Sequence, residues 1–315
     1  MAAHHEVLPS PDTVQWGAFD AAYPAVLTIA SGDTLTLHSV SGGPDELPPV
    51  GGGHVYPEHR AIHAAVPRGS GPHIITGPVA VEGAMPGDVL QVDILDVKLR
   101  QDWGYNVVKP LAGGLPNDFA HHSLMNIEID RLKNVVHMPW GLEIPARPFF
   151  GIMGVAPPRA WGRVTSVVPR SFGGNIDNKE LVAGTTLLLP VHEPGALFCA
   201  GDGHAVQGDG EVCLTAVETG LTGSFRLTVL KGRSLDLPRA ETPTHLITMA
   251  FDEDLDDAVE IALRDMICLI QERSKLNAEQ AYRLCSLVAD LRITQIVNLH
   301  KGVHVMLPRW ALQGS

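Results

Sequence analysis

The sequence predicts an α+β fold that is mostly β, with sandwich-like β-sheets and a pair of helices near the C-terminus. Short apolar runs separated by glycine, proline and aspartate recur over most of the chain, which is typical of strands joined by tight turns. After residue 251 the apolar residues change to helical spacing and then return to strand-like runs. Because strands dominate, we expect at least one sandwich-like sheet layer.

The strands are expected between turn and loop signals. Residues 1–24 have no clear period and are predicted to form a partly ordered arm. Proline-punctuated connections at 139–148 and 157–169 are incompatible with long helices. The predicted strands are 25–29, 34–40, 89–99, 124–129, 135–138, 185–191, 196–200, 212–217, 223–230, 244–250, 291–298 and 303–307.

Two helices are expected near the end of the chain. Residues 252–273 carry an apolar stripe at helical spacing, with acidic residues in the first turn. Asn277 followed by Gln280 forms a capping box that starts a second helix at about 278–290. With no clean linker in between, residues 1–315 are expected to form one interleaved unit, with possible layers at 24–220 (β-rich) and 221–315 (α+β).

Composition narrows the classes of partner. The 315 residues are 45% hydrophobic and 18% charged, as in globular proteins, and the net charge of -12 argues against a nucleic-acid partner. No run of eighteen apolar residues occurs, so no membrane partner is expected. The first residues lack a signal-peptide pattern and the four cysteines lack CxxC spacing, so a cytoplasmic protein without disulfides is expected.

The densest set of polar residues among glycines lies at 173–219. Asp202 and His204 are two residues apart, so on an extended segment they project to the same face. A carboxylate and an imidazole that converge in this way suit a divalent metal or a general-base pair. The alternative is a Gly/Asp-rich loop that makes turns, with His204 held by hydrogen bonds.

Three further features invite functional hypotheses. His54, His59 and His63 suggest a metal site, but only the last two would share a helical face, and a surface or subunit contact is favoured. Cys199 is a candidate nucleophile, although a buried strand cysteine is commoner. Glu82 ends an apolar strand, where burial would raise its pKa and suit it to carry a proton; the alternative is a solvated turn glutamate.

Several long motifs resemble those of the acetamidase/formamidase family. Residues 173–181 read GGNIDNKEL and residues 201–211 read GDGHAVQGDGE. The segments TGPVAVEGAMPGD at 76–88, PFFGIMGVAPP at 148–158 and LRITQIVNLHKGVHVMLP at 291–308 are also similar to that family. The resemblance covers about residues 74–308 and implies an oligomeric enzyme that hydrolyses linear C–N amide bonds and releases ammonia from short aliphatic amides.

The chain has no G-x-S-x-G elbow, P-loop or H-E-x-x-H motif, so an activated water is the expected nucleophile. In that scheme Asp202 and His204 are catalytic and hold zinc or calcium with a further carboxylate, for which Asp177 and Glu218 are candidates. Glu82 would carry the proton. The expected substrate-binding residues are Asn175, Gln207 and His73.

Two other functions stay open on the sequence alone. The chain could be a non-catalytic, metal-binding β-rich module that retains the polar loop for structure, or a hydrolase of a larger amide or carbamoyl substrate. Met85 replaces an acid that is common after VEGA in the family, and Val79 and Ala80 replace an aromatic residue often found after TGP. These departures bear on substrate choice more than on chemistry.

Overall fold

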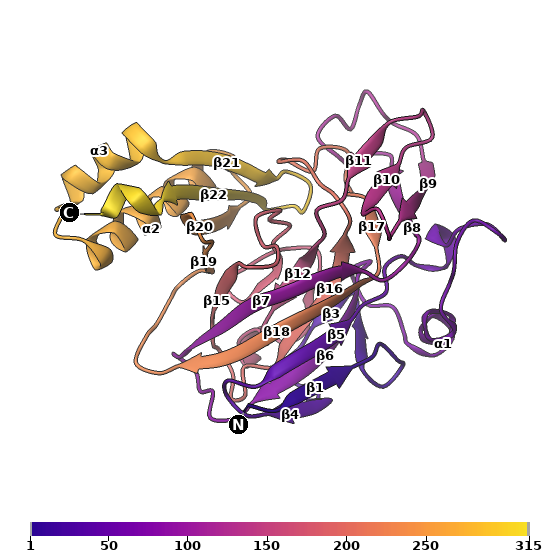
Figure 1. Cartoon of the computed structure of the whole chain (residues 1–315), viewed down its shortest axis with the longest axis horizontal. Helices are drawn as coiled ribbons and strands as arrows, with labels where there is room; N and C mark the ends of the chain where they lie inside the picture. The colour runs from indigo at the N-terminus through magenta and orange to yellow at the C-terminus, as the bar shows by residue number, and fades with distance from the viewer. Residues whose placement is uncertain (1, 314–315) are drawn as a thin grey trace.

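The computed structural model describes residues 2–313, which form two large β-sheets, a small two-stranded sheet and three α-helices (Figure 1). The first large sheet has nine strands. In spatial order these are β1 (His4–Val7), β5 (Thr34–His38), β18 (Leu221–Leu230), β7 (Val89–Leu99), β15 (Thr186–Pro190), β19 (Arg239–Glu241), β20 (His245–Asp252), β22 (Lys301–Pro308) and β21 (Asp290–Gln295).

The second large sheet has eleven strands, and β16 near its centre leads into the functional site. Its main path is β11 (Glu143–Pro145), β10 (Val135–His137), β9 (Ser123–Asp130), β8 (Trp103–Val108), β17 (Glu218–Thr219), β16 (Phe198–His204), β12 (Phe149–Gly154) and β14 (Gly173–Asn175). Beside this path β6 (Ile74–Val81) pairs with β16, β2 (Val14–Trp16) and β4 (Leu27–Ile29), and the small sheet joins β13 (Val164–Thr165) to β3 (Ala18–Phe19).

The two large sheets share one apolar core, as in a sandwich. Phe225 on β18 of the first sheet contacts Phe150 on β12 and Phe198 on β16 of the second, with ring centroids 5.5 and 5.6 Å apart. All three rings are buried. Aromatic rings at these separations combine a large buried area with favourable edge contacts, so the sheet that carries the site is held firmly against its neighbour.

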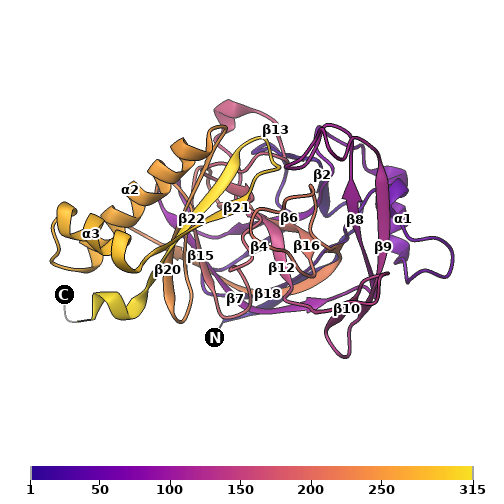
Figure 2. The same cartoon turned by 90° about the horizontal axis from the view of Figure 1, so that it is seen from above.

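The α-helices lie at the two ends of the molecule. In both views α2 (Leu255–Arg273) and α3 (Ala278–Val288) lie together beside β20 and β22, while α1 (Pro57–Ala65) lies at the far end (Figure 1; Figure 2). Three short 3-10 helices are η1 (Pro44–Glu46), η2 (Arg159–Trp161) and η3 (Arg309–Leu312). No helix within residues 2–313 combines the length and the apolar character needed to cross a membrane.

The predicted mostly β fold with a C-terminal helical pair is confirmed, and so is the capping box of Asn277 and Gln280. Two of the local expectations are wrong, and one helix is unexpected. The 1–24 segment contributes β1, β2 and β3, the 212–217 segment is not a strand, and α1 was not predicted. Because β18 lies between β5 and β7, the chain on both sides of residue 220 builds the same sheet, and a division at that point stays a prediction.

Candidate active site

The site begins at the C-terminal end of β16, which carries Asp202 and His204. His204 lies opposite Glu218 of β17 and opposite Phe149 of β12, so the ladder brings the imidazole beside the Glu218 carboxylate. The His204 ring meets the Phe149 ring edge-on, with centroids 5.0 Å apart. The imidazole is therefore packed against an apolar wall on one side and faces acidic residues on the other.

Four carboxylates surround His204, and all five side chains are buried. His204 Nε2 lies 3.3 Å from Glu218 Oε2, 3.4 Å from Asp202 Oδ2 and 3.8 Å from Asp177 Oδ1. Glu211 completes the acid cluster, which consists of Asp177, Asp202, His204, Glu211 and Glu218.

Several buried atoms of the acid cluster have no hydrogen-bond partner. These are His204 Nε2, Asp177 Oδ1, Glu211 Oε2 and Glu218 Oε2. Buried polar atoms nearly always have a hydrogen-bond partner in folded proteins, because removing a polar group from water without a new partner costs free energy. The convergence of unpaired acceptors around one imidazole nitrogen is therefore the arrangement that a cation would complete.

Gln207 fixes the orientation of the imidazole. Its Oε1 lies 2.8 Å from His204 Nδ1, so Nδ1–H donates to Gln207 and Nε2 faces the carboxylates. Its Nε2 donates to the Asp177 backbone oxygen over 2.8 Å. Both polar atoms of the Gln207 amide thus have partners within the protein, and Gln207 does not line the cavity beside the acid cluster. Its predicted role in substrate binding stays a prediction.

Three of the four acids hold an unusual backbone conformation. The φ angles of Asp177, Asp202 and Glu211 are 52, 52 and 47°, in the left-handed region that residues other than glycine rarely adopt. Such conformations persist only where the surrounding structure imposes them, and they concentrate at functional sites. The three carboxylates converge because the backbone turns at each of them.

Burial and mutual repulsion shift the ionisation of these groups. Burial, with the Asp202 charge nearby, raises the pKa of Asp177 to about 7 and that of Glu218 to about 8, and burial with Asp177 raises the pKa of Glu211 well above its usual range. Burial opposes a charge on His204, but the Glu218 and Asp202 carboxylates outweigh it and raise its pKa. A cluster of this kind favours a bound positive charge.

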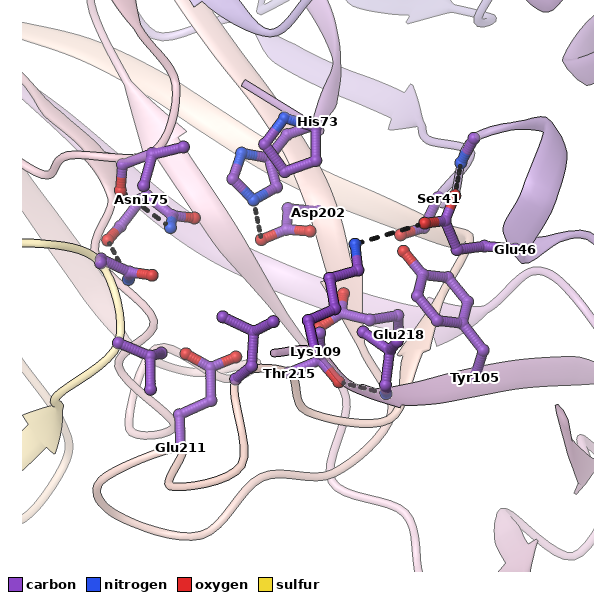
Figure 3. A pocket seen from close by; sticks show the side chains of 18 of the residues that line it. Ser41, Glu46, His73, Tyr105, Lys109, Asn175, Asp202, Glu211, Thr215 and Glu218 are labelled. Atoms are coloured by element: carbon purple, nitrogen blue, oxygen red, sulfur yellow. Dashed lines mark hydrogen bonds and ion pairs between the residues drawn. The ribbon is translucent and has the colours of Figure 1, made fainter. Parts of the chain in front are cut away.

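The acid cluster opens into a small cavity of about 130 Å³ (Figure 3). Asn175 and His73 line it, and their predicted role in substrate binding stays a prediction. Asn175 Nδ2 donates to the Val167 oxygen over 3.2 Å, while its Oδ1 is buried and unpaired. His73 Nε2 lies 3.7 Å from Asp202 Oδ2, and its Nδ1 lies 2.8 Å from Ser166 Oγ.

For two residues of the site, sequence reasoning predicted no ligand, catalytic or substrate-binding role. Asn298, in the loop between β21 and β22, donates from Nδ2 to Asp177 Oδ2 over 2.5 Å. Glu211 joins the acid cluster from the polar loop after β16. Both lie inside the family-like motifs, which was the available signal. Neither position follows from local spacing, because Asn298 reaches Asp177 across 121 residues of chain.

Glu82 lies outside this constellation. It follows β6 in an exposed turn, and it is not among the residues that line the cavity. The expected burial of this carboxyl group is wrong, because the chain turns at Gly83 and leaves the side chain in solvent. The structure therefore favours the solvated turn glutamate over the proton carrier.

The histidines of α1 and the cysteine on β16 also lie apart from the acid cluster. His59 and His63 on α1 both direct Nε2 at the Gly42 backbone oxygen, over 2.9 and 3.0 Å, so they support the loop that contains Gly42. Cys199 is 1% exposed, and burial raises the pKa of its thiol. A neutral buried thiol is a poor nucleophile.

The whole-chain comparison agrees with the motifs. The family model described as Acetamidase/Formamidase family matches residues 23–163 and 159–310. The chain belongs to the acetamidase/formamidase family. This match covers both the strands that build the acid cluster and the C-terminal loop that holds Asn298.

Solved structures of the family match over nearly the full length. The acetamidase of Bacillus halodurans is 30% identical, with a TM-score of 0.84 and coverage of 98% of this chain and 99% of that chain. A predicted acetamidase/formamidase of Thermoanaerobacter tengcongensis is also 30% identical, with a TM-score of 0.86 and coverage of 98% of both chains.

Among curated sequences, the acetamidase of Mycolicibacterium smegmatis is 26% identical over 221 residues, which is 51% of this chain and 54% of that protein. The chain thus spans about half the length of the curated relatives it matches.

Proposed function

We propose that the protein is an amidohydrolase that hydrolyses short linear amides, of the formamide or acetamide type, to a carboxylate and ammonia. The observation that carries this proposal is the buried acid cluster, whose unpaired acceptors face a small cavity. The names of the family and of its relatives point to the same substrate class. A cavity of about 130 Å³ suits a small amide better than a drug-sized ligand, whose pockets measure roughly 300–1,000 Å³.

The acid cluster fits a divalent metal. Its side chains form two overlapping groups, Asp177 with His204 and Glu211, and Asp202 with His204 and Glu218, whose ligand atoms lie within 4.8 Å of one another. One imidazole among carboxylates suits zinc, and the number of carboxylate oxygens also suits calcium. When bound there, either ion would polarise the amide carbonyl and lower the pKa of a bound water.

In this proposal Asp177, His204 and Glu211 hold the metal. Glu218 is then left free to act as the proton carrier, in place of Glu82. Its Oε1 accepts a hydrogen bond from the Ala216 backbone N–H over 3.0 Å, which orients the carboxyl group and leaves the buried Oε2 unpaired. Burial raises its pKa to about 8, so the group can hold a proton near neutral pH. Glu218 Oε2 would accept a proton from the attacking water and donate it to the departing ammonia.

Asn175 and His73 position the substrate in this proposal. The unpaired Oδ1 of Asn175 can accept a hydrogen bond from the amide NH₂, because its Nδ2 is already held by the Val167 oxygen. His73 stands beside Asp202 at the cavity wall, where its Nε2 can reach the bound amide. The homo-oligomeric state implied by the family is part of the same proposal, and light scattering would measure it.

The proposal is tested by ammonia release from formamide, acetamide and propionamide. We expect activity that is lost after chelation and returns with zinc or calcium. Glu218→Gln should lower kcat by about 100-fold or more, while Glu82→Gln, a matched change outside the cavity, should leave it unchanged. Metal binding without ammonia from any amide would instead support the non-catalytic metal-binding module, and activity that survives thorough chelation would remove the metal from the scheme.

A further inference from the structure

One wall of the cavity is built from alternate residues of β8 and its continuation. Tyr105, Val107 and Lys109 all line the cavity, as expected for side chains two residues apart on an extended segment. Tyr105 lies opposite Glu218 in the strand register, at the level of the acid cluster. Val107 is 2% exposed, whereas the Lys109 side chain is 36% exposed. The wall therefore runs from the acid cluster outward to Lys109 at the rim.

The rim is crossed by an ion pair. Lys109 Nζ lies 3.5 Å from Glu46 Oε1, and both residues line the cavity. Figure 3 shows the Lys109 side chain extended toward Glu46. Glu46 belongs to η1, and its Oε2 accepts a hydrogen bond from the Gly43 N–H over 2.9 Å, so the acid is fixed to its own wall. The pair thus connects two walls that come from distant parts of the chain.

Part of the cavity lining is apolar. Its side chains include Val107, Val167, Leu214 and Val297. Val107 lies between Tyr105 and Lys109 on this wall. An amide whose carbonyl carbon lies at the acid cluster, with Asn175 and His73 at its amide group, would extend its acyl chain along Val107. The length available to that acyl chain then ends where Lys109 meets Glu46.

We propose that Lys109 and Glu46 are specificity-determining residues that close the acyl end of the cavity and limit the length of the amide that the site accepts. This inference rests on the proposed function. Lys109 acts by its bulk, and Glu46 holds it across the rim. Because the pair is partly exposed, salt should weaken the hold and relax the preference for short amides.

The test compares acetamide with hexanamide in kcat/KM and, independently, in binding measured by calorimetry on the metal-loaded protein. Lys109→Ala should raise the hexanamide-to-acetamide ratio by about 10-fold or more, the usual size of a methylene-level steric discrimination. Glu46→Gln retains an acceptor for the Gly43 N–H, and should relax the ratio less. Lys133→Ala is the matched control, because Lys133 also pairs over 3.5 Å, with Asp130, but lies outside the cavity.

An unchanged ratio in Lys109→Ala would overturn the proposal that Lys109 and Glu46 limit the acyl length. An equal loss on both amides would also overturn it, because it would make Lys109 a substrate-binding group. If the wild-type protein released no ammonia from any amide, the proposed function would fail. The hexanamide-to-acetamide ratio in binding would then test the limit on acyl length by itself. A rise of this ratio in Lys109→Ala would support the limit, and equal or absent binding of the two amides in every variant would overturn it.

Discussion

Asn298 Nδ2 donates a hydrogen bond to Asp177 Oδ2 over 2.5 Å, and Asp177 Oδ1 is left unpaired toward His204. Asp177 follows β14 in the eleven-stranded sheet, whereas Asn298 follows β21 at the edge of the nine-stranded sheet. The contact thus connects the C-terminal α+β part of the chain to the acid cluster. It also fixes which of the two Asp177 oxygens faces the imidazole.

Replacing Asn298 by alanine should therefore impair the site more than the fold. Loss of an outer partner of a metal-binding carboxylate typically lowers metal affinity or activity by about 10–100-fold, and we expect kcat/KM for acetamide to fall in that range. Asn277→Ala is the control, because Asn277 caps α3 and its loss should cost about 1 kcal/mol of stability without changing kcat/KM. Equal activity in the two variants would show that the Asp177 contact is dispensable.

Gly151 on β12 gives the acid cluster its space. A Cβ built there would overlap Asp177 Oδ1 and lie 2.8 Å from His204 Nε2. Gly151→Ala should displace one of these side chains and lower both metal affinity and kcat/KM by about 100-fold, as expected for a misplacement of about 1 Å. Gly208→Ala is the matched control, because a Cβ there meets nothing within 4 Å. Isothermal titration with zinc or calcium would separate loss of the site from loss of turnover.

Cys199 should take no part in the reaction. Its thiol is buried, its pKa is raised by burial, and Gln15 Nε2 lies 3.5 Å from its Sγ. We expect Cys199→Ala to retain kcat within about 2-fold, since a neutral buried thiol does not act as a nucleophile. Iodoacetamide should modify the exposed Cys268 while activity persists, as mass spectrometry of the labelled protein would show. A loss of activity that tracks Cys199 labelling would restore the covalent mechanism.

The parts of the fold that the sequence predicts correctly depend on neighbours close in the chain. The helix α3 and its capping box are an example, because Asn277 and Gln280 satisfy each other's backbone groups within one turn. The 212–217 run failed as a strand because Leu214 has a φ of 114°, which breaks an extended backbone. Helix α1 was missed because its buried face comprises only His59 and Ile62, too little for an apolar stripe.

In the candidate site, too, the residues that could be predicted are those that depend on neighbours close in the chain. Asp202 and His204 could be paired from their spacing, because both stand at the end of one strand. Asn298 and the cavity rim depend on how distant segments meet, which spacing does not contain. Glu82 illustrates the converse: its apolar neighbours predicted burial, yet the turn after β6 leaves its side chain in solvent.

His59 should make the fold sensitive to acid. It is fully buried on α1, its Nε2 lies 2.9 Å from the Gly42 oxygen, and the groups that act on its charge include His63, Arg100 and Arg60. Burial, reinforced by these neighbours, lowers its pKa to about 4, against about 6.5 in an unfolded chain. The unfolded chain therefore binds a proton in this interval that the folded protein does not bind. The contribution to stability is complete above about pH 6.5 and is lost as the pH falls toward 4.

A shift of this size corresponds to roughly 3 kcal/mol of unfolding free energy once the pH has fallen to about 4. Urea unfolding between pH 7.5 and 4.5 should show the wild-type stability falling with pH. His59→Gln, whose amide can still donate to the Gly42 oxygen but does not titrate, should show a shallower fall. His245→Gln is the control, because His245 begins β20 and has a hydroxyl partner, Thr244. Equal slopes for the wild type and His59→Gln would show that His59 is not the group that responds to pH.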